Sequence, residues 1–146
     1  MIEKFKSIFA GLDRAHGVTI VEDTNGNGSK VKGKSFVKRE AVTDELWKNH
    51  LEGTENLGII PINDNNECKW GCIDIDFYAE FDHKKLITTI LAKKLPLVVC
   101  KSKSGGAHVF LFVTEPCTAR DMQIKLTEIA CLLYTSPSPR DKRQSR

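Results

Sequence analysis

The segment that most constrains the fold is residues 70–77, WGCIDIDF, where two aspartates alternate with apolar side chains. Successive side chains of an extended strand point to opposite faces, so Asp74 and Asp76 would share a face with their Cα atoms about 6.6 Å apart. Ile73 and Ile75 would point toward a core. Burying a strand that carries two carboxylates is costly unless positive charge compensates them. Two divalent cations would do so, and paired metals support nucleotidyl transfer, so we predict a metal site at Asp74 and Asp76.

The segment Lys101–His108, KSKSGGAH, lies one predicted helix farther along the chain, between the apolar segments PLVVC and VFLFV. Glycines permit close backbone approach, and successive N–H groups in such a turn can bind an anion such as a triphosphate. A glycine pair alone usually marks an ordinary hairpin turn, but its position one helix after the aspartates favours a phosphate site. The predicted nucleotide-binding residues are Ser102, Lys103, Ser104, Gly105, Gly106 and His108.

The IDID strand followed by the KSKSGGAH loop resembles motifs I and II of the archaeo-eukaryotic primase superfamily, an acidic D-x-D and a small-residue loop that ends in His. The strings LGIIPI…IDID and VVCKSKSGGAH are similar to the primase domain of phage and TOTE-conflict-system proteins. The resemblance runs from Ile2 to Ala130 and includes GLDRAHG and VTDELWKNHLEG. It implies a DNA primase or primase-polymerase that performs template-dependent nucleotidyl transfer in DNA replication, using nucleoside or deoxynucleoside triphosphates.

The same resemblance implies the cofactor, the partners and the roles of the site residues. Mg²⁺ or Mn²⁺ would be bound by Asp74 and Asp76, and His108 would contact the phosphates of the incoming nucleotide as a catalytic residue. A DNA template, nucleoside triphosphates and a fused or neighbouring helicase are the expected partners. The third metal-binding carboxylate of these primases lies in a later strand, so we expect this chain to be a C-terminally truncated portion of the catalytic domain, which need not be active by itself.

The expected fold is α+β: a single primase-type domain with a mixed RRM/ferredoxin-like sheet, the site on one face and helices on the other. LGIIPI and CKWGCIDIDF are expected to pair through an NDNNE turn, with IDID in a central strand. PLVVC would return parallel to IDID by a right-handed crossover and pair with VFLFV. Four helices are expected: one that ends near Gly11, one from a Thr43 cap to His50, one that begins after an Asp82 cap, and one that begins after a Thr118 cap. A strand over 18–21 and the strand SFVKR would flank a basic turn at 25–34.

The last sixteen residues, 131–146, read CLLYTSPSPRDKRQSR and resemble the translation of a sequencing adapter. We therefore expect the domain to cover 1–130 and the tail to be artefactual or disordered. The whole chain has 22 Lys+Arg and 19 Asp+Glu, but four of those basic residues and one acidic residue lie in this tail, which leaves 18 of each. Net charge therefore does not indicate nucleic-acid binding. A local cluster around the basic turn fits either a solvated hairpin or a template contact: Lys30, Lys32, Lys34, Lys38 and Arg39.

Two other functions remain compatible with parts of this pattern. A glycosyltransferase also binds a metal through D-x-D, but it needs a doubly wound sheet upstream, which the hairpin-rich N-terminal half disfavours. A non-catalytic nucleic-acid-binding module usually displays exposed aromatic side chains, and Trp70 is the one aromatic residue expected on the site face. His16, His50 and His83 are expected to be structural or solvent-facing.

The sequence also predicts a compartment. No apolar run approaches the roughly 18 residues of a membrane span, and no signal peptide is expected. The cysteines outside the tail are expected to be reduced, half-buried thiols: Cys68, Cys72, Cys100 and Cys117. These features predict a cytoplasmic protein of a bacterial or phage-infected cell, with no membrane partner.

Overall fold

The computed structural model describes residues 2–21, 33–76, 81–102 and 105–134. The chain divides into two compact units, Met1–Lys69 and Trp70–Arg146, called here the N-terminal and C-terminal units. Helices and antiparallel sheets occur together, so the α+β class is confirmed. The strands are divided between two three-stranded sheets rather than joined in one mixed sheet.

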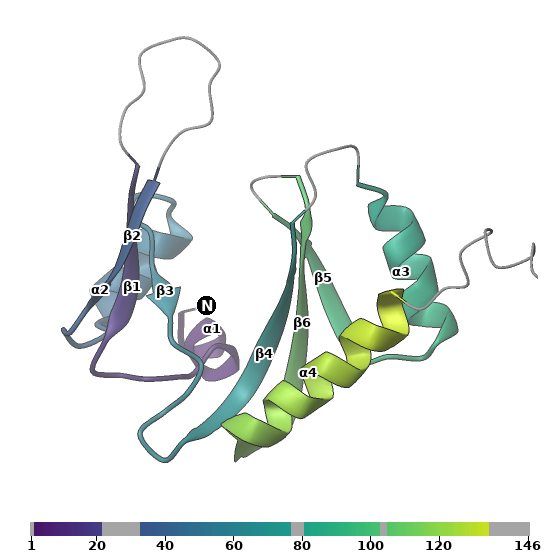
Figure 1. Cartoon of the computed structure of the whole chain (residues 1–146). Helices are drawn as coiled ribbons and strands as arrows, with labels where there is room; N and C mark the ends of the chain where they lie inside the picture. Colours follow the sequence, from purple (N-terminus) through teal and green to yellow (C-terminus); the bar gives the residue numbers. More distant parts are fainter. Residues whose placement is uncertain (1, 22–32, 77–80, 103–104, 135–146) are drawn as a thin grey trace, which may run out of the picture. The chain divides into compact units, whose positions relative to one another are not determined.

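The N-terminal unit contains a sheet with the strand order β2-β1-β3 (Figure 1). Its elements are α1 (Ile2–Ile8), β1 (His16–Val21), β2 (Gly33–Lys38), α2 (Asp44–Leu51) and β3 (Gly58–Ile59). β1 and β2 pair antiparallel from His16↔Lys38 to Val21↔Gly33, which confirms the predicted hairpin, although most of its turn lies outside the described residues. The two helices pack through Phe5 and Trp47, whose rings meet edge to face with centroids 5.9 Å apart.

Helix α2 begins where the sequence predicts. The hydroxyl of Thr43 accepts a hydrogen bond from the Leu46 N–H, which satisfies a backbone donor left free at the helix start. Gly53 follows the helix with a φ of +76°, a left-handed conformation that glycine adopts without strain. The predicted cap and stop of this helix are therefore both confirmed.

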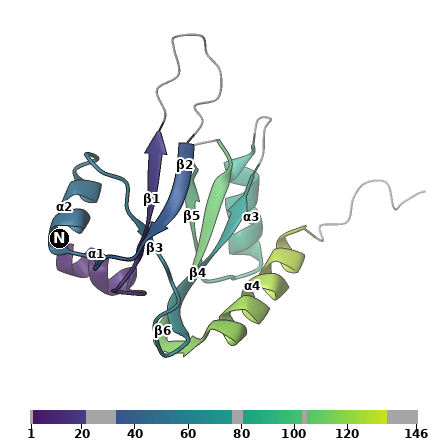
Figure 2. The ribbon, with the colours of Figure 1, turned by 60° about the vertical axis from the view of Figure 1, so that its left-hand side comes forward.

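The C-terminal unit contains β4 (Glu67–Ile75) from Trp70 onward, α3 (His83–Ala92), β5 (Leu97–Lys101), β6 (Ala107–Thr118) and α4 (Ala119–Tyr134). The strand order is β4-β6-β5, so β6 is the central strand. Figures 1 and 2 show α3 and α4 on one side of these strands. The core between helices and strands includes Ile75, Ile90 and the fully buried Val109. The expected arrangement of helices on one sheet face is therefore present in this unit.

Two predicted strand positions are wrong. LGIIPI contributes only β3, Gly58–Ile59, which pairs with β1 instead of forming a hairpin with β4. A turn does form before β4, because the Asn63 N–H donates to the Glu67 carbonyl over 2.9 Å, but no ladder follows from it. In addition, β4 lies at an edge of its described sheet rather than at the centre, because β6 separates it from β5.

Helix α4 continues through Cys131 to Tyr134, four residues past the expected end of the domain at Ala130. Leu133 packs against the core as a half-buried side chain. The rest of the expected tail, 135–146, lies outside the described residues. None of the helices in the described part of the chain is long and apolar enough to cross a membrane.

Candidate functional site

The face of the β4-β6-β5 sheet opposite the helices brings Asp74 and His108 together. Asp74 is on β4 and His108 is on the neighbouring β6, and both alternate with residues that point into the core. Asp74 Oδ1 and His108 Nε2 are 3.4 Å apart, and the two side chains are 60% and 43% exposed. An acidic oxygen and an imidazole nitrogen are thus adjacent and open to solvent.

Asp76 directly follows the last residue of β4 and is exposed, as Asp74 is. This exposure overturns one step of the sequence reasoning. The two carboxylates remain hydrated, so burial does not by itself demand a compensating cation here. The chemistry of the ligands still favours a metal, because two exposed carboxylates lie two residues apart in the sequence and supply hard oxygen atoms.

The predicted phosphate loop is a tight turn between β5 and β6, whose ladder closes with the pair Lys101↔Ala107. The Ser102 N–H donates to the Gly106 carbonyl over 3.0 Å, and the Gly105 N–H donates to the Ser102 carbonyl over 3.1 Å. Gly105 has a φ of +96°, a conformation that favours glycine. The turn therefore explains why glycine is present at position 105.

Within this turn, the predicted ligands differ in accessibility. Ser102 is only 7% exposed, whereas His108, at the start of β6, is accessible. Lys103 and Ser104 lie outside the described residues. Of the predicted phosphate ligands that the structure describes with a polar side chain, His108 is the one best placed to meet a ligand in solution.

His83 has a structural role, which is one of the two expected from the sequence, but its link to the glycine turn was not predicted. It is the first residue of α3, directly after the Asp82 cap, and its Nε2 lies 2.9 Å from the Gly106 carbonyl oxygen. The imidazole N–H donates to that oxygen, which also accepts from Ser102. Its ring packs edge to face against Phe81, with centroids 4.9 Å apart. His83 thus connects the start of α3 to the glycine turn; its position after a helix cap was the available sequence signal.

The site face also carries more aromatic side chains than expected. Trp70 lies with its ring centroid 6.0 Å from that of Phe110, and Phe110 stacks on Phe112 at 5.9 Å. His108 meets Phe110 edge to face at 6.2 Å. The expectation that Trp70 alone occupies this face is therefore wrong. The alternation of His108, Phe110 and Phe112 in the sequence was the signal that identifies the face.

Cys72 lies on the same face as Asp74, two residues earlier on β4. Burial raises the pKa of the Cys72 thiol to about 11, and the Asp74 carboxylate adds to the shift. The thiol is therefore protonated at neutral pH, which makes it a poor metal ligand and nucleophile. Among the described residues, no group of three or more His, Cys, Asp or Glu side chains is arranged to bind a metal ion. Mg²⁺ commonly binds through one or two carboxylates together with water and substrate phosphates, so Asp74 and Asp76 fit that kind of site.

A model of the archaeo-eukaryotic primase domain of the TOTE conflict system matches residues 14–138. The chain belongs to this family. The match spans both units of the primase domain and includes the paired aspartates, the glycine turn and His108. A search of curated proteins found no match.

Family membership establishes a general kind of chemistry for the primase domain. Domains of this family are primase-like, and such domains transfer nucleotides, bind nucleic acid and nucleotides, and generally use divalent metals. The geometry of Asp74 and His108 is compatible with that chemistry. The roles of the individual side chains belong to the proposal that follows.

Proposed function

We propose that this primase domain joins nucleoside or deoxynucleoside triphosphates on a DNA template. The observation that carries the proposal is the contact of Asp74 with His108 on an open sheet face, directly beside the glycine turn. A carboxylate for a cation and an imidazole for a phosphate are the two groups that a nucleotide–metal complex needs side by side. The family match supports assigning the contact to nucleotidyl transfer.

Asp74 and Asp76 are the residues that would hold Mg²⁺ or Mn²⁺. Their ligand atoms are carboxylate oxygens, which both ions prefer, and both side chains are exposed enough to share a cation with a bound triphosphate. When bound, the cations would activate the attacking hydroxyl and stabilise the leaving pyrophosphate. The exposure of the carboxylates fits a site that is completed by the substrate.

His108 and the glycine turn would orient the triphosphate. In the structure, the His108 Nε2 faces Asp74. Once Asp74 binds a cation, its oxygen is less available to His108, which can then donate its N–H to a phosphate oxygen. His83 holds the Gly106 carbonyl and so fixes the turn against α3. We therefore expect cation and triphosphate to bind cooperatively.

The structure disfavours one of the two alternative functions and gives some support to the other. A glycosyltransferase would present D-x-D in a doubly wound sheet, whereas Asp74 lies in a three-stranded sheet with the order β4-β6-β5. A non-catalytic nucleic-acid-binding module gains one supporting observation, the aromatic row of Trp70, Phe110 and Phe112 on the site face. That module would bind nucleic acid without needing Asp74 or Asp76.

The deciding experiment is template-dependent nucleotide incorporation, measured with the whole chain on a primed DNA template. Mn²⁺-dependent incorporation is expected, with loss in Asp76→Ala. Glu128→Gln is the matched control: Glu128 is an exposed carboxylate on α4, paired with Lys125 at 2.7 Å, and should leave the activity unchanged. Nucleic-acid binding without incorporation, or incorporation that survives Asp76→Ala, would support the non-catalytic module or another site instead.

A further inference from the structure

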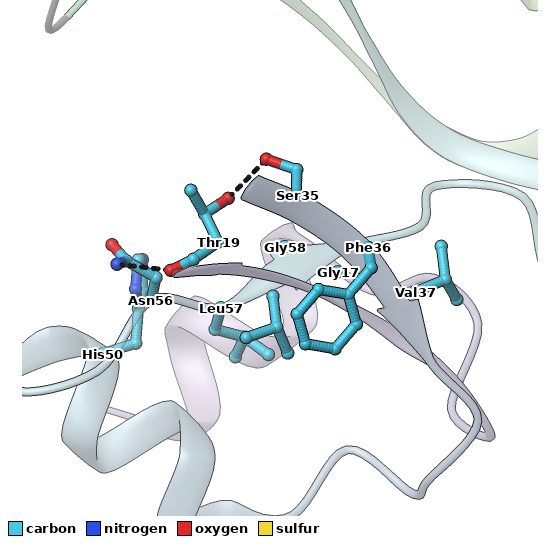
Figure 3. A pocket seen from close by; sticks show the side chains of 10 residues that line it. Gly17, Thr19, Ser35, Phe36, Val37, His50, Asn56, Leu57 and Gly58 are labelled. Carbon is cyan, nitrogen blue, oxygen red and sulfur yellow. Dashed lines mark hydrogen bonds between the residues drawn. The ribbon is translucent and has the colours of Figure 1, made fainter. Parts of the chain in front are cut away.

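The N-terminal unit contains an open cavity of about 410 Å³ beside its sheet (Figure 3). Its apolar part comes from Val18, Phe36 and Leu57, and His50 and Asn56 lie at one end. Figure 3 shows Phe36 and Leu57 on one side of the strands and the Thr19–Ser35 hydroxyl pair on the other. Cavities of a few hundred Å³ suit small planar ligands.

Phe36 contributes an exposed aromatic ring to the lining of this cavity. It pairs directly with Val18 across the β1–β2 ladder, and its side chain remains 39% exposed. Exposing the apolar face of an aromatic ring to water is unfavourable, and a ligand stacked on the ring would cover that face. Nucleobases present such a face whatever their identity.

Positive charge lies on both sides of Phe36. Lys34 and Lys38 are two residues away in each direction on β2, so they project from the same face of the strand. Arg39 follows directly, and Glu40 neutralises part of this charge through its contact with Lys38 at 3.3 Å. The described residues 33–40 therefore combine three cations with one anion. The flexible lysine side chains on both sides of the ring can contact phosphates of a strand whose base is stacked there.

The polar end of the cavity can distinguish a base from an apolar side chain. His50 Nδ1 lies 3.3 Å from the Glu55 carbonyl oxygen, so the neutral ring carries its proton on Nδ1 and leaves Nε2 as an acceptor. The Asn56 side-chain amide donates to the Thr19 carbonyl over 3.3 Å. Its amide oxygen can accept from a further donor. These acceptors suit the N–H groups on the edge of a nucleobase.

We propose that this cavity binds a base of a single-stranded nucleic acid, stacked on Phe36, with the flanking phosphates on Lys34 and Lys38. The identification of that strand as the template rests on the proposed function, but its binding needs neither metal nor Asp74. A second β-strand is disfavoured as the occupant because β2 is an edge strand that carries lysines, which oppose strand pairing. The proposal thus assigns nucleic-acid binding to the N-terminal unit.

The test is fluorescence anisotropy of a labelled oligothymidylate and of an oligonucleotide of equal length with abasic positions, both in EDTA. Phe36→Ala should weaken oligothymidylate binding at least about fivefold, given the usual strength of base–aromatic stacking. Phe36→Trp should restore the binding. Lys34→Ala and Lys38→Ala should each lower the salt dependence by about 0.7 in the log–log slope. Leu91→Ala, on α3, and Lys93→Ala, at the C-terminal cap of that helix, are matched controls and should change neither quantity.

Three outcomes would overturn the proposal. Equal binding of the abasic strand would show that the contact is electrostatic only. Unchanged affinity in Phe36→Ala would place the base elsewhere. A shift from dimer to monomer in Phe36→Ala during sedimentation, with unchanged DNA binding, would identify a self-association surface. Because the assay contains no metal, a negative result does not bear on the proposed catalytic site. Likewise, a finding that Asp74 binds no metal does not bear on base binding in this cavity.

Discussion

Gly71 allows α4 to pack directly on β4, the strand that carries Asp74. A Cβ atom at position 71 would lie 2.6 Å from Leu126 Cδ1 and 3.0 Å from both Cγ and Sδ of Met122. Contacts this short do not persist in folded proteins, so Gly71→Ala must displace these side chains or separate α4 from β4. The first is cheaper, because Leu126 Cδ1 is the end of a flexible side chain.

The cost can be worked from these contacts. Overpacking of this kind costs about 1–3 kcal/mol in unfolding free energy, and the flexible neighbour favours the lower half of that range. Leu126→Ala alone removes a half-buried side chain and should cost about 1–2 kcal/mol. In the double variant the new methyl group occupies space that Leu126 has left. The double variant should therefore be more stable than the sum of the single changes predicts, by about 1 kcal/mol.

The assay is urea unfolding followed by Trp70 fluorescence, in a Trp47→Phe background that leaves one reporter in the C-terminal unit. Ile124→Ala is the matched control, because Ile124 is an exposed residue of α4 and should combine additively with Gly71→Ala. If Gly71→Ala and Leu126→Ala are also additive, or if Gly71→Ala leaves the unfolding midpoint unchanged, the close packing of β4 on α4 is refuted.

Three further predictions follow from individual contacts. At pH 8, Cys100 should react with a disulfide reagent faster than Cys72, because burial raises the pKa of Cys72 to about 11 whereas Cys100 is exposed; faster labelling of Cys72, identified by mass spectrometry, would contradict this. His83→Ala should weaken triphosphate binding several-fold, since the imidazole holds the Gly106 carbonyl, and His83→Gln should recover part of the loss; equal affinity by calorimetry would argue against this role. Leu133→Ala should cost about 1–2 kcal/mol of unfolding free energy because it packs on the core, whereas deletion of 135–146 should cost nothing; the reverse order would show that the packed part of the chain extends beyond α4.

Local patterns predicted much of the fold. The caps at Thr43 and Asp82 set the starts of α2 and α3 through hydrogen bonds to residues three positions later in the sequence, so they can be predicted locally. The pairing of β3 could not be predicted in this way. It depends on close approach of Gly17 and Gly58, two residues far apart in the sequence, where an added Cβ would meet backbone at 3.2–3.5 Å. Proximity along the chain favoured the wrong partner.

For the site, alternation along the strands correctly placed Asp74 near His108. It could not show that both carboxylates are exposed, because burial depends on what covers a sheet face. The contact of His83 with Gly106 joins two segments that only the folded chain brings together. Roles that depend on a bound nucleotide or metal remain predictions, and binding experiments decide them.

The central claim is that Asp74, Asp76 and His108 form one metal and nucleotide site, and calorimetry of Mn²⁺ binding with and without a nucleoside triphosphate tests it most directly. We expect weak Mn²⁺ binding to the chain alone and tighter binding with the triphosphate. Asp74→Asn/Asp76→Asn should abolish both, His108→Ala should reduce mainly the gain from the triphosphate, and Glu128→Gln should change neither. Mn²⁺ binding that is unchanged in Asp74→Asn/Asp76→Asn would show that the paired aspartates are not the site.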